Sequence, residues 1–255
     1  MIRLTLRFYG DLNELVYNSH KGKEFVRRIP APTSVKDLIE GCGVPHTEVD
    51  LILADGKRVD FSYLISANQY ISVYPVFYFL DAPASDYLQP ETPPDPRFVV
   101  DVNLGKLAGY LRMAGFDATY RNDAEDEELI QQMEAEQRIL LTRDRKLLMR
   151  NAVRYGYLPR SDDPSEQLAE VIRRFDLFDS IEPFSRCPNC NSPLQPVAKE
   201  EVLDQLEPLT KRYYDTFSQC PNCGQVYWAG SHIERMNPTL KRFFNNESLR
   251  HTAEP

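Results

Sequence analysis

Two aspartates stand where short apolar runs end. The run 98–100 leads into Asp101, and the run 139–141 is followed by Thr142 and, two residues later, by Asp144. Continuous apolar runs of this length, separated by helix-like stretches, predict buried parallel strands. Ligands of such sheets sit beyond the carboxyl ends of the strands, so the two aspartates converge if the first and third strands are neighbours. This arrangement predicts a site for a hard cation such as Mg²⁺ or Mn²⁺.

A cation site of this kind suits phosphodiester hydrolysis, because a metal ion activates water and offsets charge on the attacking and leaving oxygens. The hydroxyl of Thr142 could hold a metal-bound water or a phosphate oxygen beside Asp144. In a different interpretation the two aspartates only cap helices, and the cations that follow them are simply solvated. Those cations, which could instead bind phosphate, are Arg143, Arg145, Lys146, Arg150 and Arg154.

Four of the five cysteines form two Cys-Pro-Asn-Cys pairs, Cys187 with Cys190 and Cys220 with Cys223. Each pair has the spacing of a zinc knuckle, and two knuckles give a tetrahedral site with all four positions filled. Structural zinc is therefore expected, with a redox dithiol or no metal as the alternatives. The aromatic side chains of this region could stack on RNA bases or simply cover a small core.

The expected α/β layer over residues 98–184 must position the acids. Helical patterns over 103–113 and beyond Asn122 alternate with three apolar runs, which are the two above and a run at 117–120 between them. The second helix opens with an acidic run, in which Asn122 or Asp123 is expected as the N-cap. Asp123 is also the candidate for a further catalytic acid. Its competitors for that role are Asp126, Glu127 and Glu128.

Residues 1–80 have the pattern of a separate domain. Alternating apolar residues begin at Ile2, and the turn Asp55-Gly56 predicts a hairpin. The order of strands and helix resembles the ubiquitin-like β-grasp fold of small sulfur-carrier proteins. Those carriers end in a free Gly-Gly tail, whereas this chain continues, so docking to a protein partner is the expected role. The Pro-rich stretch 81–97 predicts a stiff linker, behind which the domain should fold alone and be dispensable for basal cleavage.

The central region resembles the Mut-seven C-terminal RNase family, a branch of the PIN-like nucleases. The similarity rests on the following stretches: Val100-Asp101, Leu104-Gly105-Lys106-Leu107-Ala108, Leu111-Arg112, Gly115-Phe116-Asp117 and Ile139-Leu140-Leu141-Thr142-Arg143-Asp144. The resemblance implies a metal-dependent nuclease that acts on RNA. It also implies that Asp101 is the first-strand acid and that Thr142 and Asp144 form the Thr-x-Asp motif. Cations expected to contact substrate are Arg112, Arg143, Arg145 and Lys146.

The expected fold class is α/β, with a PIN-like parallel-sheet domain and a four-cysteine zinc ribbon after an N-terminal β-grasp domain of the α+β type. The ribbon is expected over 185–235, and a C-terminal helix and tail over 236–255. Only Asp162 and Asp163 are available as the fourth acid that many PIN domains have.

The formal net charge of −8 at pH 7 excludes a wholly basic binding face, so RNA must use a local patch or metal ions. No apolar run approaches eighteen residues, which predicts a cytoplasmic protein without membrane contact. His46 and Cys42 have no expected chemical role. Two other functions compete with the nuclease: a non-catalytic RNA- or protein-binding adaptor and, more weakly, a receiver-like phospho-acceptor domain.

Overall fold

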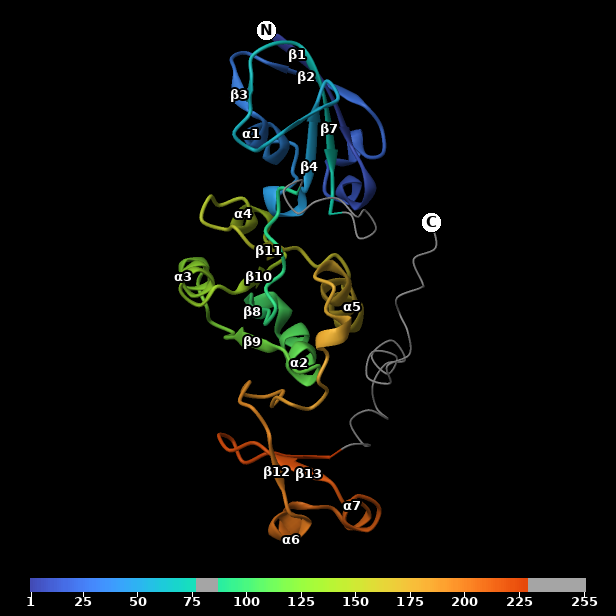
Figure 1. Ribbon diagram of the computed structural model, residues 1–255, viewed down its shortest axis with the longest axis vertical. Coiled ribbons are helices and arrows are strands. Elements are labelled where there is room, and N and C mark those ends of the chain that lie inside the picture. The colour runs from blue at the N-terminus through green and yellow to red at the C-terminus, as the bar shows by residue number, and fades with distance from the viewer. Residues whose placement is uncertain (77–86, 229–255) are drawn as a thin grey trace. The chain divides into compact units, whose positions relative to one another are not determined.

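The computed structural model describes residues 1–76 and 87–228 (Figure 1). The expected C-terminal helix and tail, 236–255, lie outside the described residues. The same holds for 81–86 of the expected linker and for 229–235 of the expected ribbon.

Two compact units make up the chain. The first comprises residues 1–93 and 125–158, and the second comprises 94–124 and the chain from 159 onward. The expected nuclease domain, 98–184, contributes segments to both units. Each unit is described by itself.

A five-stranded mixed sheet forms the β-grasp part of the first unit (Figure 1). The strand that begins the chain pairs parallel with one neighbour and antiparallel with the other, as the β-grasp prediction requires. Leu4, Leu6 and Phe8 alternate inward and are buried, so the period-two pattern of the sequence is confirmed. In sheet order the strands are β2 (Phe25–Ile29), β1 (Ile2–Phe8), β7 (Gln69–Tyr74), β4 (Leu51–Ala54) and β5 (Lys57–Val59).

Helix α1 (Val35–Glu40) supplies the other layer of this domain, where Leu38 and Ile39 are buried. Ser34 caps the helix by accepting a hydrogen bond from the backbone N–H of Asp37 at 3.0 Å. Next to the helix lies a two-stranded antiparallel sheet of β3 (Thr33–Ser34) and β6 (Leu64–Ile65).

Two residues of the expected linker, Leu88 and Gln89, form hydrogen bonds with this domain. The backbone N–H groups of Leu88 and Gln89 donate to Oδ1 of Asp50 at 3.1 and 2.9 Å. The Gln89 side-chain amide donates to the carbonyl oxygens of His46 and Val49. Asp50 is buried, and these N–H groups stabilise its charge. Residues 87–89 therefore belong to the first unit, while the expectation of a stiff linker over 81–97 stays a prediction.

Parallel strands carry the candidate acids in both units. In the second unit β8 (Arg97–Val100) pairs parallel with β9 (Asp117–Tyr120), and helix α2 (Gly105–Met113) connects them. Helix α5 (Pro164–Arg174) packs on α2. Phe98 is fully buried, with its ring 6.0 Å from that of Phe116 and 6.1 Å from that of Phe175.

In the first unit, β10 (Ile139–Leu141) pairs parallel with β11 (Gly156–Tyr157), with helix α4 (Arg145–Leu148) between them. The expected parallel α/β arrangement is thereby confirmed. Helix α3 (Asp126–Glu136) packs on β10.

The expected N-cap of α3 is wrong. Glu125 is the N-cap, and the backbone N–H of Glu125 donates to Oε2 of Glu128 at 3.1 Å in a capping box. The helix starts later than predicted because this reciprocal pair satisfies two free N–H groups at once, which Asn122 or Asp123 cannot do.

The ribbon in the second unit is a small antiparallel sheet in the order β12 (Gln195–Val197), β13 (Phe217–Gln219) and β14 (Val226–Trp228). Helices α6 (Lys199–Val202) and α7 (Pro208–Tyr213) form the insert between the cysteine pairs. A core of its own includes buried Val202, Leu206, Phe217 and Val226, with Val197, Tyr214 and Trp228 packed against it. Most of these aromatic side chains thus cover a small core, as one of the two interpretations predicts.

We predict that Asp50→Ala lowers the free energy of unfolding by about 1–3 kcal/mol, because the partly buried N–H group of Gln89 loses its acceptor and that of Leu88 keeps only the backbone carbonyl oxygen of residue 50. Urea unfolding of the full chain measures this change. Asp60→Ala is the control, since the exposed Asp60 carboxylate accepts from the nearby backbone N–H of Ser62. An equal, small effect of both substitutions would show that residues 87–89 do not need Asp50.

Candidate functional site

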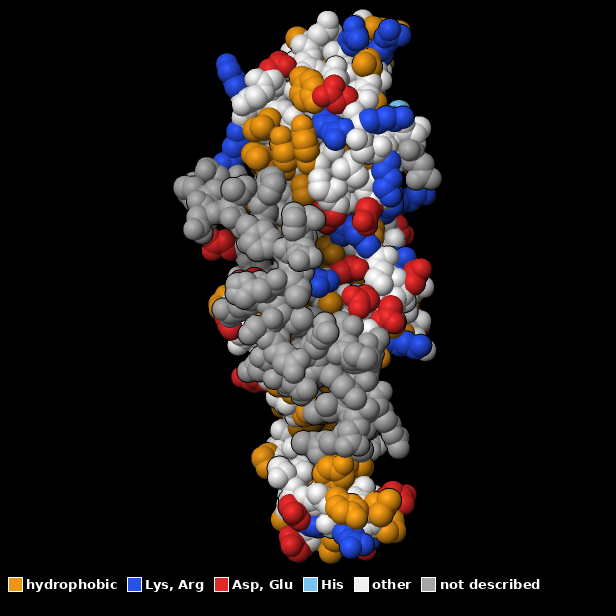
Figure 2. All heavy atoms as spheres, turned by 90° about the vertical axis from the view of Figure 1, so that its right-hand side faces the viewer, with side chains coloured by type: hydrophobic (Ala, Val, Ile, Leu, Met, Phe, Trp, Pro, Cys, Tyr) orange, Lys and Arg blue, Asp and Glu red, His pale blue; other side chains and the backbone are white. Residues whose placement is uncertain are grey.

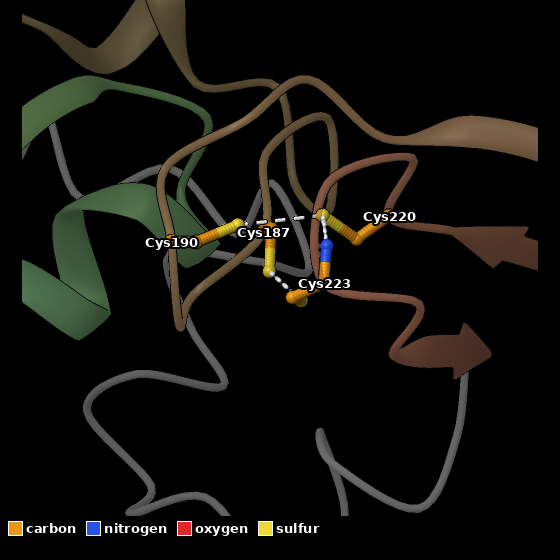
Figure 3. Close-up of side chains that lie close together, drawn as sticks. All are labelled: Cys187, Cys190, Cys220 and Cys223. Atoms are coloured by element: carbon orange, nitrogen blue, oxygen red, sulfur yellow. Dashed lines mark hydrogen bonds between the residues drawn. The ribbon is translucent and has the colours of Figure 1, made fainter.

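The four knuckle cysteines converge in the second unit (Figure 3). Their sulfur atoms all lie within 4.8 Å of one another. Cys187 Sγ lies 3.6 Å from Cys223 Sγ, and Cys190 Sγ lies 3.4 Å from Cys220 Sγ. Zn–S bonds of about 2.3 Å in a tetrahedron place the sulfurs about 3.8 Å apart, so this cluster fits one metal ion such as zinc.

Burial and hydrogen bonds shift the pKa values of two knuckle cysteines in opposite directions. Burial works against ionisation of Cys190, but hydrogen bonds from the Ser192 backbone and the Asn222 side chain lower its pKa to about 5. The backbone N–H of Gln225 also favours the thiolate of Cys223. Burial and the neighbouring thiols outweigh that bond and raise the Cys223 pKa to about 12. Bringing four thiolates together therefore requires a cation.

Arg112 joins helix α2 to the first knuckle. Its side chain is buried, and Nε donates to the carbonyl oxygen of Ala118 at 2.8 Å. Nη1 donates to the carbonyl oxygens of Pro188 and Asn189 at 3.1 and 3.0 Å. Burial lowers the pKa of Arg112, while the nearby Cys187 and other negative groups oppose that change. These contacts give the side chain a structural role, and its expected contact with substrate stays a prediction.

A second joint links the same knuckle to strand β9. The Asn191 side chain accepts from the backbone N–H of Ala118 at 3.1 Å and donates to Asp117 Oδ1 at 2.7 Å. Arg186 donates to the carbonyl oxygen of Asn191 and lies 3.8 Å from Asp117. Sequence reasoning missed Asn191 and Arg186. The signal available was that an amide and an arginine directly flank the first cysteine pair.

Asp101 follows strand β8 as predicted. It is only 6% exposed, and its Oδ1 accepts from the backbone N–H of Val102 at 2.6 Å. The carboxylate thus caps the 3-10 turn Val102–Leu104, which leads into α2. A buried carboxylate is costly unless hydrogen bonds or a cation stabilise its charge.

Asp144 lies three residues beyond the end of strand β10 and is exposed. Its Oδ1 accepts from the backbone N–H groups of Lys146 and Leu147 at 2.7 and 3.4 Å, which caps α4. The buried hydroxyl of Thr142 accepts from the backbone N–H of Asp144 at 2.9 Å. The structure therefore brings Thr142 and Asp144 together. Asp101 belongs to the other unit.

Asp123 is exposed and pairs with Arg121, whose Nε lies 3.1 Å from its Oδ1. Among its competitors, Asp126 and Glu127 both pair with Arg150.

Of the expected substrate-binding cations, Arg143 and Lys146 are exposed. Arg145 is engaged with the β-grasp domain, because its Nη1 donates to the carbonyl oxygen of Leu15 at 2.7 Å. The face in Figure 2 carries both acidic and basic side chains. This face is therefore not wholly basic, in agreement with the expectation from the net charge of −8.

We predict that Cys187→Ser releases the metal and loosens the ribbon, because metal binding contributes to the folding free energy of such a site. Metal analysis and a chromophoric chelator measure the loss. Cys42→Ser is the control, since Cys42 is buried outside the cluster. Wild-type protein that contains no zinc would contradict this expectation.

We predict that Arg112→Ala lowers the free energy of unfolding by about 2–4 kcal/mol and speeds zinc loss to a chelator, because the knuckle carbonyls lose a charged donor. Arg112→Lys should recover only part of the effect, since an ammonium lacks the planar fork. Arg97→Ala serves as the control, because it removes only a surface ion pair with Asp95. If zinc loss is equally fast in all three variants, the contact is unimportant.

Comparison with known families agrees with this architecture. A profile of the Mut7-C RNAse domain matches residues 96–240, and a profile of the Mut7-C ubiquitin domain matches residues 1–81. Searches of curated proteins and of solved structures returned no significant match. In the part of the chain that the structure describes, no helix is long and apolar enough to cross a bilayer.

The resemblance drawn from the sequence, including the order of the domains, is confirmed. The first profile spans more than half of the chain. The chain therefore belongs to the Mut7-C RNase domain family and carries a Mut7-C ubiquitin-like domain at residues 1–81.

Proposed function

We propose that the protein is a metal-dependent ribonuclease in which Asp101 and Asp144 hold Mg²⁺ or Mn²⁺. The observation that carries this proposal is that both aspartates follow parallel strands within the matched RNase domain. Ligands of parallel sheets gather beyond the carboxyl ends of the strands. The cluster of four cysteines is proposed to hold zinc in a purely structural role.

The chain's own groups have distinct roles in this proposal. A bound Mg²⁺ or Mn²⁺ would supply an activated water and would offset charge on the phosphate oxygens. Asp101, buried at the end of β8, and Asp144, at the end of β10, supply the carboxylate ligands. Thr142 orients Asp144 by accepting its backbone N–H. Asp123 is proposed as the further acid, because a surface ion pair with Arg121 holds it only weakly.

RNA is the proposed substrate because the matched family is described as an RNase domain. The exposed Arg143 and Lys146, which flank Asp144, are proposed to contact its phosphates. The substrate contact of Arg112 remains a prediction, because its guanidinium already donates to three carbonyl oxygens. The ubiquitin-like domain is proposed to bind or dock protein, and the protein is proposed to act in the cytoplasm.

A non-catalytic adaptor is the second candidate, and one observation favours it. Both Asp101 and Asp144 accept backbone N–H groups at the start of the following turn or helix. Capping alone would explain an aspartate at each position. In that case the zinc ribbon and the ubiquitin-like domain would bind RNA or protein without cleavage.

Asparagine substitutions separate the two candidates. Asn keeps the shape of Asp and can still cap a helix, but it lacks the charge that holds a divalent cation. We therefore predict that Asp101→Asn and Asp144→Asn each reduce Mn²⁺-dependent RNA cleavage roughly 100-fold or more while the fold is retained. The double variant should be scarcely worse than either single one, since both acids act on one metal site.

Cleavage of single-stranded and structured RNA, with and without Mn²⁺ or Mg²⁺, measures the effect. Asp60→Asn is the matched control, because Asp60 also accepts a backbone N–H but lies in the ubiquitin-like domain. Folded, zinc-loaded wild type that cleaves no RNA would decide for the adaptor. Equal cleavage by wild type and both variants would point to a contaminating nuclease.

A further inference from the structure

We infer that the ubiquitin-like domain holds the segment that carries Asp144 in place, with Arg145 as the positioning residue. The inference rests on the proposed role of Asp144 in metal binding. Arg145 follows Asp144 directly and is the first residue of α4. Its Nη1 donates to the carbonyl oxygen of Leu15 at 2.7 Å and to that of Gly43 at 3.4 Å. Both acceptors belong to the ubiquitin-like domain.

The acceptor site for Arg145 depends on a glycine. Gly43 has a φ of +94°, a conformation that other residues rarely adopt. A Cβ at this position would lie 3.1 Å from the carbonyl oxygen of Leu15 and 3.6 Å from Nη1 of Arg145. Gly43 therefore lets the two carbonyl oxygens approach the same guanidinium nitrogen. The charge of Arg145 strengthens both hydrogen bonds.

Three more contacts hold the chain that follows Arg145 to the same domain. Each joins a polar side chain of the ubiquitin-like domain to a group between α4 and the residue after β11, within the first unit. The contacts run from Lys36 Nζ to Asn151 Oδ1 (2.6 Å), from His46 Nε2 to the carbonyl oxygen of Val153 (2.9 Å) and from the backbone N–H of Leu158 to Glu48 Oε1 (2.8 Å).

The position of Asp144 depends on these contacts because α4 is a single turn of four residues. A helix this short has no stability of its own, so tertiary contacts decide where it lies. The Asp144 carboxylate caps this turn through the N–H groups of Lys146 and Leu147. A change at Arg145 is therefore transmitted to the carboxylate through one turn of backbone.

Two expectations from the sequence differ from this inference. The Pro-rich linker pattern predicts that the ubiquitin-like domain is dispensable for basal cleavage, and Arg145 is expected to bind substrate. Kinetics separate the two roles of Arg145. A lost substrate contact raises KM, whereas a displaced metal ligand lowers kcat and raises the Mn²⁺ concentration needed for activity.

The first test is hydrogen exchange on the full-length, zinc-loaded protein, which requires no activity. Arg145→Gln and Gly43→Ala should each reduce protection of the Lys146 and Leu147 amides roughly tenfold or more. Gly43→Ala changes the acceptor site and leaves the sequence of α4 unchanged. Gly56→Ala is the matched control, because Gly56 also has a positive φ, +76°, but has no atom within 4 Å of the added Cβ. The control should leave these amides protected.

The second test measures cleavage of RNA over a range of Mn²⁺ concentrations. Arg145→Gln and Gly43→Ala should both lower kcat roughly tenfold and raise the Mn²⁺ requirement, with KM unchanged. Full amide protection in both variants overturns the inference, whether or not the wild type cleaves RNA. Raised KM alone in Arg145→Gln, with protection retained, would assign Arg145 to the substrate. An inactive wild type would overturn the nuclease, while the exchange result would still decide the positioning role.

Discussion

The structure depends on arginine side chains that bind backbone carbonyl oxygens of segments far away in the sequence. Arg112 binds the carbonyls of Pro188 and Asn189, and Arg145 binds that of Leu15. A guanidinium offers several donors in a fixed plane and keeps its charge when partly buried, so it can satisfy several acceptors at once. Each of these arginines attaches an accessory module, the ribbon or the ubiquitin-like domain, to a helix that follows a candidate acid.

The two candidate acids illustrate why capping and metal binding are not exclusive. A carboxylate at the end of a parallel strand also stands at the start of the next helix, where free N–H groups favour negative charge. Asp101 and Asp144 both use one oxygen in this way. Such hydrogen bonds orient a carboxylate, which is also what a metal ligand requires. The geometry at this position is therefore compatible with both capping and metal binding. Only metal binding requires the negative charge of the carboxylate.

The sequence predicted the elements whose signals are local. Alternation in β1, the Asp55-Gly56 turn with both φ values positive, and the paired cysteines each depend on neighbouring residues. It could not predict partners that are backbone atoms more than seventy residues away, as for Arg112 and Arg145. A carbonyl oxygen has no sequence signature, so an arginine that binds one looks like an arginine that binds phosphate.

The contacts of the ubiquitin-like domain with the rest of its unit also involve backbone groups and so have no sequence signature. Sulfur carriers of this fold act through a free C-terminal tail, whereas this domain contacts the rest of its unit through side chains such as Lys36, His46 and Glu48. Two of these three contacts involve backbone groups of the partner segment, which point substitutions there do not remove. Glu48 is buried, so the contact with Leu158 forms only when the two segments are folded together. The domain therefore shares one compact unit with α4 and β11 and contacts both segments through its side chains.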